Sequence, residues 1–315
     1  MDRRAYGQFK GMLLRTLKKM DTNNQCLYPG CKKKPIDSHV IAESVLERIA
    51  HNGKVLTWNW YEEDIANSDP NDQGWERIYA EPKEAGIRKD VTYPIFCCMH
   101  DNDIFQALEN PGFDSQPVQV VLLAYRALCY KTWNPHVKER LEFLLSFKEN
   151  ETLAEHEQSL ALLPLQEARE RLEQMLDTRD YTQLEYRIIT LNIPPCIACS
   201  DAFIPTDEGE DRRILKGSLS LTAEDVLTFS FFPERDPNKS MCVITWFRDS
   251  QRAAQFRESY ELDQLSKDEL PEMLVTLAFT YNIFVSLTWW ETLSQEAKQK
   301  SKELQLAHAQ ALTNL

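Results

Sequence analysis

The chain has 315 residues, of which 43% are hydrophobic and 27% charged. This composition is typical of a soluble globular protein, and the length favours two or three packed units over one core. No apolar run is long enough to cross a bilayer, and residues 1–20 lack the continuous apolar stretch of a secretory signal. We therefore expect a cytoplasmic protein with no membrane partner.

The net charge of −13 is unevenly distributed. Residues 1–60 contain 11 Lys and Arg against 5 Asp and Glu, so the rest of the chain is strongly acidic. Phosphate contacts dominate nonspecific affinity for nucleic acid, which argues against binding by the acidic part. If DNA or RNA binds, we expect the contacts within residues 1–60. For the run Lys32-Lys33-Lys34 alone, a charged face exposed to solvent is a simpler interpretation than a nucleic-acid contact.

The N-terminal third alternates between short helices and strands. Apolar residues from Tyr6 to Met20 recur at helical spacing and predict an opening helix over 3–20. The segments that follow are a strand at 36–41, a helix at 42–50, a strand at 54–60, an acidic loop at 62–72, a β-rich run at 91–96 and a helix at 101–109.

The middle of the chain is helical in pattern, and the end mixes strands with helices. Val118 to Tyr130 is apolar nearly all round and predicts a buried helix. Pro135 restarts a helix, and a third helix covers 165–176. The strands predicted next are 184–191, 214–221, 226–232 and 242–247, and the helices after them are 252–262, 267–280 and 288–311. Short connections between the strands favour an antiparallel meander.

These patterns predict an α+β protein in three parts. Residues 1–115 form a zinc-binding module, residues 116–180 a helical region, and residues 181–315 an antiparallel sheet with helices.

Two short cysteine motifs carry the zinc prediction. Cys26 and Cys31 are separated by Leu-Tyr-Pro-Gly, which can turn two thiolates back onto one metal. Cys97 and His100 have the two-residue gap of a second half-site, and His100 lies at a predicted helix start. Eight cysteines in a reducing compartment are not expected to form disulfides. The sequence therefore predicts one structural Zn2+ bound by Cys26, Cys31, Cys97 and His100.

The other cysteines have simpler interpretations. Cys98 is the alternative ligand to Cys97, but it lies only two residues from His100, which is awkward geometry. We therefore expect Cys98 to be a buried thiol. Cys129 and Cys242 lie in apolar runs and read as small buried hydrophobes. Cys196 and Cys199 form another two-residue pair with no partner pair, and we interpret them as thiols in a strand region.

A zinc site whose halves bracket a hairpin, with a His on the hairpin and a helix after the last ligand, resembles the treble-clef-like HNH or His-metal-finger endonucleases. The resemblance implies that His39, in Ile36-Asp37-Ser38-His39-Val40-Ile41, is the general base. It implies that Asp101, with Asn102 as the next candidate, holds a catalytic Mg2+ or Mn2+ on the scissile phosphate. The chain departs from the family pattern in three ways. Ser38 stands where an acidic residue is common, the central Asn is not assignable, and the insert before Cys97 is long.

Each of these residues also has a structural interpretation. Asp101 can be the N-cap of the helix that follows it, and His39 can be a buried residue or one that supports the zinc ligands. The alternative function is a non-catalytic zinc module that binds nucleic acid, a protein partner or a second copy of the chain.

The chain as a whole resembles a poorly characterised group of bacterial proteins associated with phage-defence loci. The resemblance rests on pieces spread over most of the chain, which are Cys26-x4-Cys31, Ser38-His39, Phe96-Cys97-x2-His100-Asp101-x3-Phe105, Leu123-Ala124-Tyr125-Arg126 and Asn282-x6-Trp289-Trp290-Glu291. It implies one full-length family, but it does not supply a mechanism. Taken together with the resemblance to HNH endonucleases, it leads us to expect a zinc-stabilised nuclease in phage defence.

Overall fold

The fold was analysed in a computed structural model. It describes residues 25–58, 82–109, 112–145, 154–205, 222–259 and 283–313, together with residues 275 and 278. For residues 134–145, 154–163 and 306–313 only the backbone is described. The predicted opening helix at 3–20, the loop at 62–72 and the strand at 214–221 lie outside these residues. Of the predicted helix 267–280, the two described residues are helical.

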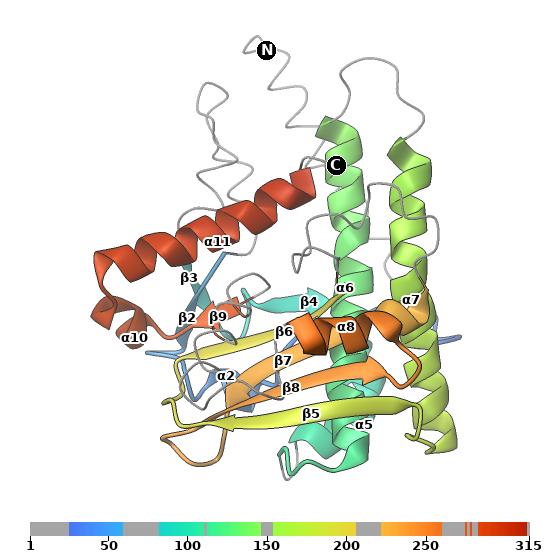
Figure 1. The fold of residues 1–315 in the computed structure, drawn as a ribbon, viewed down its shortest axis with the longest axis horizontal. Helices are drawn as coiled ribbons and strands as arrows, with labels where there is room; N and C mark the ends of the chain where they lie inside the picture. The colour runs from blue at the N-terminus through green and yellow to red at the C-terminus, as the bar shows by residue number, and fades with distance from the viewer. Residues whose placement is uncertain are drawn as a thin grey trace.

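A seven-stranded antiparallel sheet forms the centre of the molecule (Figure 1). Its strands lie in the order β3-β2-β9-β6-β7-β8-β5. Their bounds are Lys54–Thr57 for β2, Lys83–Gly86 for β3, Leu184–Leu191 for β5, Ile197–Phe203 for β6, Leu227–Pro233 for β7, Ser240–Phe247 for β8 and Ile283–Val285 for β9. Because β9 pairs with both β2 and β6, it joins the N-terminal hairpin to the C-terminal strands.

Both faces of the sheet are buried, so its central strands are almost continuously apolar. In β7, Leu227, Phe229 and Phe231 belong to one core cluster, while Phe232 belongs to the other. This separation follows from the two-residue period of a strand. Some of the polar residues inside are paired across strands, as Thr228 and Thr245 are, with hydroxyl oxygens 2.7 Å apart. The sheet is therefore the middle layer of three.

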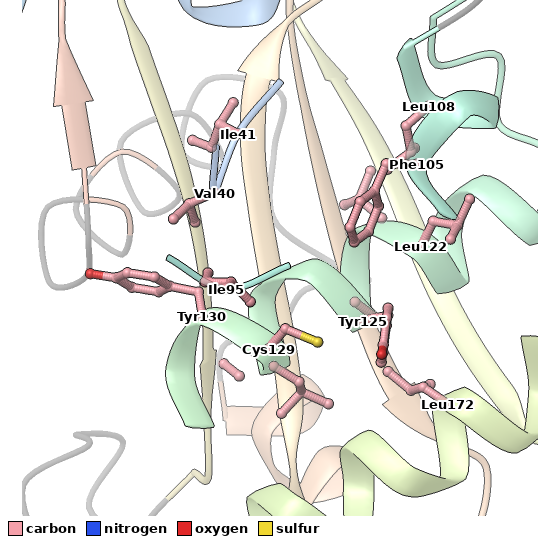
Figure 2. Close-up of a cluster of buried hydrophobic side chains, with 14 of the residues drawn as sticks. Val40, Ile41, Ile95, Phe105, Leu108, Leu122, Tyr125, Cys129, Tyr130 and Leu172 are labelled. Carbon is pink, nitrogen blue, oxygen red and sulfur yellow. The ribbon is translucent and has the colours of Figure 1, made fainter. Parts of the chain in front are cut away.

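Helices form the two outer layers. The helices on the first face are α5 (Cys98–Glu109), α6 (Pro117–Leu145) and α7 (Ala154–Thr178), and those on the second are α8 (Gln251–Ser259), α10 (Leu287–Thr292) and α11 (Gln295–Thr313). Figure 2 shows how Phe105 of α5, Tyr125 of α6 and Leu172 of α7 meet in the first core.

The N-terminal module adds a second, two-stranded sheet. Strand β1 (Asp37–His39) pairs antiparallel with β4 (Thr92–Pro94), and His39 lies opposite Thr92. The short helix α2 (Glu43–Leu46) follows β1, and α5 begins four residues after β4 ends. Two paired strands followed by a helix therefore surround the predicted zinc ligands.

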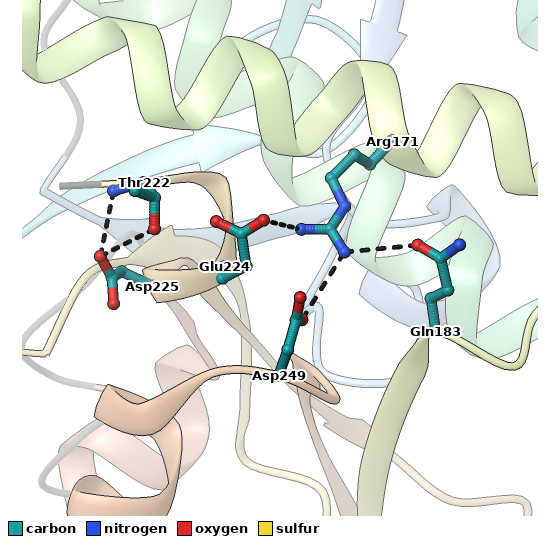
Figure 3. A network of polar contacts seen from close by, with 6 residues as sticks. All are labelled: Arg171, Gln183, Thr222, Glu224, Asp225 and Asp249. Carbon is teal, nitrogen blue, oxygen red and sulfur yellow. Dashed lines mark hydrogen bonds and ion pairs between the residues drawn. The ribbon is translucent and has the colours of Figure 1, made fainter.

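A polar network fixes α7 against the C-terminal strands (Figure 3). Arg171 donates to Glu224 at 2.6 Å and to Gln183 at 3.3 Å, and its guanidinium lies 4.1 Å from the centre of the Phe247 ring. Glu224 belongs to the short 3-10 helix η2 (Ala223–Asp225), which Thr222 caps through Asp225. One arginine thus connects three separate segments.

The α+β class and the placement of its parts are confirmed, but several elements differ from prediction. Strand β5 pairs with β8 rather than with β6, so only β6-β7-β8 form a meander. Helix α6 continues through Pro135 instead of restarting there. Strands β3, β6 and β9 were not predicted as separate elements. The predicted helix 288–311 is divided at Leu293, which has an extended backbone. The domain boundaries at 115 and 180 remain a prediction. Within the described part of the chain, no helix is long and apolar enough to cross a membrane.

Candidate metal centre

The first half of the centre is a tight turn. The Cys31 amide donates to the Tyr28 carbonyl at 3.0 Å, and Gly30 has a φ of +71°. This left-handed conformation strains residues with a Cβ, which explains the Pro-Gly between the two cysteines. The Cys26 amide donates to the Lys33 carbonyl at 2.9 Å, so the chain enters and leaves the turn as a closed loop.

The second half lies at the start of α5. Cys97 immediately precedes the helix and His100 lies in its first turn, so both side chains project to one side. The Leu27 amide donates to the Ile95 carbonyl at 2.9 Å, and the Ile36 amide donates to the Phe96 carbonyl at 2.7 Å. These two backbone hydrogen bonds hold the halves together, although 66 residues separate Cys31 from Cys97.

The four predicted ligand side chains converge. Their ligand atoms all lie within 4.8 Å of one another. The Cys31 and Cys97 sulfurs are 3.9 Å apart, and His100 Nδ1 lies 3.3 Å from Cys26 Sγ and 3.5 Å from Cys97 Sγ. Tetrahedral zinc, with Zn–S of about 2.3 Å and Zn–N of about 2.0 Å, places its ligand atoms roughly 3.5–3.8 Å apart. The cluster is therefore consistent with a structural Zn2+ site.

The surroundings of the cluster also suit a closed site. Cys26 and Cys97 are buried. The Tyr28 ring stacks on the His100 ring, with centroids 4.0 Å apart, which fixes the orientation of the imidazole. Burial raises the pKa of Cys26 to about 11. Burial also opposes ionisation of Cys97, but backbone amides at the start of α5 lower its pKa. Four protein ligands with no open position are typical of structural zinc.

The remaining cysteines lie outside this group. Cys98 is exposed, so the prediction of a buried thiol is wrong. Asn102 Nδ2 donates to the Cys98 carbonyl at 2.8 Å and lies 3.5 Å from its sulfur. Cys129, Cys242 and Cys199 are almost fully buried, and burial raises the pKa of Cys196 to about 12. Among the described residues, no second group of metal-binding side chains comes together. The interpretation of Cys196 and Cys199 as thiols in a strand region is consistent with β6.

His39 does not contribute to the zinc group and lies half-buried at the end of β1. Its Nε2 lies 2.8 Å from the Ile87 carbonyl oxygen. Because a carbonyl can only accept, Nε2 carries the proton, and in the neutral ring Nδ1 is left as the basic nitrogen.

Asp101 lies in the first turn of α5, where β1 and α6 approach it. Burial raises the pKa of its carboxyl, while the Arg126 guanidinium, a Ser38 hydrogen bond and the charge of His39 act in the opposite direction. The helix begins at Cys98, so Asp101 is not its N-cap and that alternative is wrong. Its amide instead makes a helical hydrogen bond to the Cys97 carbonyl at 2.9 Å.

Two neighbours of this pair were missed from the sequence. Ile87 follows the unpredicted strand β3, so nothing marked its carbonyl as the partner of His39. In the sequence, Arg126 has a place only in the segment Leu123-Ala124-Tyr125-Arg126, one of those on which the whole-chain resemblance rests. A charged residue inside an otherwise apolar helix was the signal that could have identified it.

Comparisons of the chain with protein-family models, curated proteins and solved structures found no match.

Proposed function

We propose that the N-terminal module is a zinc-stabilised, metal-dependent nuclease of the HNH-like type, with His39 as general base and Asp101 as ligand of the catalytic metal. The observation that carries the proposal is that Asp101 lies in the helix that supplies the last predicted zinc ligand, near enough to His39 for the imidazole charge to act on the pKa of its carboxyl. Strand β1 supplies the base, and helix α5 supplies both the last zinc ligand and the carboxylate. In this proposal, zinc bound by Cys26, Cys31, Cys97 and His100 has only a structural role.

The chemistry assigns one task to each residue. His39 donates through Nε2 to Ile87, which orients the ring and leaves Nδ1 to accept a proton from the attacking water. A divalent cation such as Mg2+ or Mn2+ would stabilise negative charge on the phosphate. Asp101 suits such an ion, because Mg2+ is commonly bound through one or two carboxylates together with substrate phosphates. Arg126 remains close enough to interact with the same carboxylate.

Two substitutions test the catalytic assignment against matched controls. His39→Ala and Asp101→Ala are each expected to abolish Mg2+- or Mn2+-dependent cleavage of plasmid DNA or RNA while keeping one zinc per chain. The controls are His51→Ala and Asp103→Asn, because both residues are exposed and Asp103 belongs to the same helix. Bound zinc, melting temperature and cleavage rate are measured for all four variants.

The outcomes separate the proposal from its alternatives. Loss of zinc in His39→Ala would make His39 a structural residue. Loss of activity in the control variants would point to a general effect on folding. If the wild-type protein cleaves neither DNA nor RNA with any divalent metal, the nuclease proposal is rejected.

The second candidate function is a zinc module that binds nucleic acid without cleaving it. It is favoured by the exposed surface beside the centre, where Lys32, Lys33 and Lys34 follow a zinc ligand directly. Two large hydrophobic residues near the ligands in the sequence, Ile36 and Met99, are exposed, and Lys33 Nζ is 3.7 Å from Met99 Sδ. Basic side chains with apolar neighbours suit contact with a phosphate backbone and its bases.

Replacing the three lysines with Gln is expected to weaken binding to an oligonucleotide. The slope of the logarithm of the binding constant against the logarithm of the salt concentration is expected to fall by up to about three, because the variant can neutralise up to three fewer phosphates. The matched control replaces Lys298, Lys300 and Lys302 of α11. Fluorescence anisotropy across a range of salt concentrations measures both quantities. Equal binding of the two triple variants at every salt concentration would contradict this assignment.

We also propose a cellular role in phage defence, which rests on the resemblance of the whole chain. Expression of the wild-type protein is expected to lower phage plating efficiency, and His39→Ala is expected to restore it. Full protection by the His39→Ala variant would separate defence from cleavage.

A further inference from the structure

A cavity of about 270 Å³ lies between the N-terminal module and the central sheet. Its walls come from the segment after β1, from α2, from the end of α5, from α6 and from strands β6 to β8. Pockets for drug-sized ligands have volumes of about 300–1,000 Å³, so this one suits a small molecule. Its lining is mainly apolar, with side chains that include Val40, Val45, Leu108, Leu123, Phe232 and Met241.

A buried arginine lies in the wall of this cavity. Arg126 is 4% exposed, and its guanidinium lies 3.9 Å from the centre of the Phe105 ring. Its terminal nitrogen donates to Glu109 Oε1 at 2.7 Å, but its Nε has no hydrogen-bond partner among the described residues. Leaving a buried charged donor unsatisfied is unfavourable. An acidic group brought against the guanidinium from the cavity would supply the missing acceptor.

The other polar groups add a consistent charge pattern. Arg48 and Arg235 also line the cavity, so three arginines face two glutamates in a chain whose net charge is −13. Arg48 donates to the carbonyls of Pro233 and Glu234. The Glu234 Oε2 atom is buried without a partner among the described residues, and it can accept a hydrogen bond from a ligand.

We infer that this cavity binds a small organic anion with a flat or branched apolar body. Its carboxylate, sulfonate or phosphate lies at Arg126, and its apolar body contacts Val45, Leu123 and Phe232. Glu109 competes with the ligand anion for the Arg126 guanidinium, because it already accepts a hydrogen bond from it. The Glu109 side chain lies at the rim of the cavity and is 42% exposed. The ligand therefore replaces Glu109 at the guanidinium. Neither the zinc centre nor nuclease activity enters this inference.

Two probes that differ only in charge test it on the full chain. They are 2-naphthoate and its neutral amide, 2-naphthamide, and binding is measured by titration calorimetry and by the shift in melting temperature. The acid is expected to bind at one site per chain and at least about tenfold more tightly than the amide, since charge-assisted hydrogen bonds are the stronger kind.

Four variants locate the site. Arg126→Gln is expected to weaken naphthoate binding about tenfold, while Glu109→Gln strengthens it by removing the competing carboxylate. Ser44→Trp, at an exposed position of the lining, is expected to block binding without disturbing the core. Arg88→Gln is the matched control, because Arg88 contacts Glu43 of α2 outside the cavity.

The opposite responses at positions 126 and 109 keep the inference testable even if Arg126→Gln proves unstable. In that case, tighter binding by Glu109→Gln together with loss of binding in Ser44→Trp supports the site. Equal binding of the two probes, or naphthoate binding that survives Ser44→Trp, overturns it.

Discussion

At the residue scale, two adjacent cysteines have different environments. Cys97 is 3% exposed and its sulfur belongs to the metal cluster, while Cys98 is exposed and contacts Asn102. Cys97 lies just before α5 and Cys98 begins it, so the two side chains project in different directions. The sequence favoured Cys97 because its two-residue gap to His100 matches a zinc half-site, and the geometry agrees with that choice.

Replacing each cysteine in turn tests this assignment. Cys97→Ser is expected to lose the bound metal and to lower the melting temperature, because structural zinc contributes to the free energy of folding. Cys98→Ser is expected to retain one zinc per chain and to unfold like the wild-type protein. Elemental analysis and thermal denaturation measure the two properties. Zinc retained in Cys97→Ser but lost in Cys98→Ser would reverse the assignment.

The site could be predicted from the sequence only where its residues lie close together in the chain. The four predicted zinc ligands come as two short motifs, each with a recognisable spacing. The partner of His39 is a backbone carbonyl 48 residues away, and carbonyls carry no sequence signal. Arg126 approaches Asp101 from another helix. Its position in an apolar stretch marked it as unusual, but only the three-dimensional packing shows that Asp101 is its neighbour.

At the element scale, strands with a strong apolar pattern were the easiest to predict. The bounds of β5 agree with the prediction at both ends, and β7 and β8 lie within a residue or two. By contrast, β9 has three residues and β3 is the polar run Lys-Glu-Ala-Gly, so neither shows a periodic pattern. Pairing with longer neighbours stabilises these short strands, and that depends on the tertiary fold.

The Arg171 network makes a testable contribution at this scale (Figure 3). Arg171→Met is expected to destabilise the protein by about 1–2 kcal/mol, because it removes a partly buried ion pair and a cation–π contact. Glu224→Gln is expected to cost less, and Asp249→Asn close to nothing, since the Asp249 side chain is 62% exposed and 3.7 Å away.

Urea denaturation of the three variants checks this order. A larger loss for Asp249→Asn than for Arg171→Met would show that the turn after β8, rather than helix α7, is the stabilised element.

At the scale of the whole molecule, the zinc cluster and the sheet share one core. Cys26 and Cys97 belong to the same buried cluster as Phe247 of β8 and Phe284 of β9. A change at the metal should therefore reach the sheet through packed side chains. The sequence suggested separate units because the cysteine motifs and the strand-rich region lie far apart in the chain.

Removal of zinc is expected to lower the melting temperature of the entire protein in a single transition. A strong chelator is added, and circular dichroism is followed in the far and near ultraviolet during heating. The two signals should move together, and added zinc should reverse the change. A zinc-dependent loss confined to a small part of the signal would show that the module unfolds independently of the sheet.

Strand β9 also determines when the sheet can be completed. It lies between β2 and β6, yet residues 283–285 leave the ribosome after all the other described strands of the sheet. Until then, the nascent hairpin β2–β3 and the strands from β5 to β8 each present an unpaired edge. The metal ligands are all synthesised by residue 100, so zinc can bind while these edges are still open. With zinc bound as proposed, a chain whose translation stops before β9 is metal-bound but prone to aggregation. Its unpaired strand edges are exposed to recognition by protein quality control.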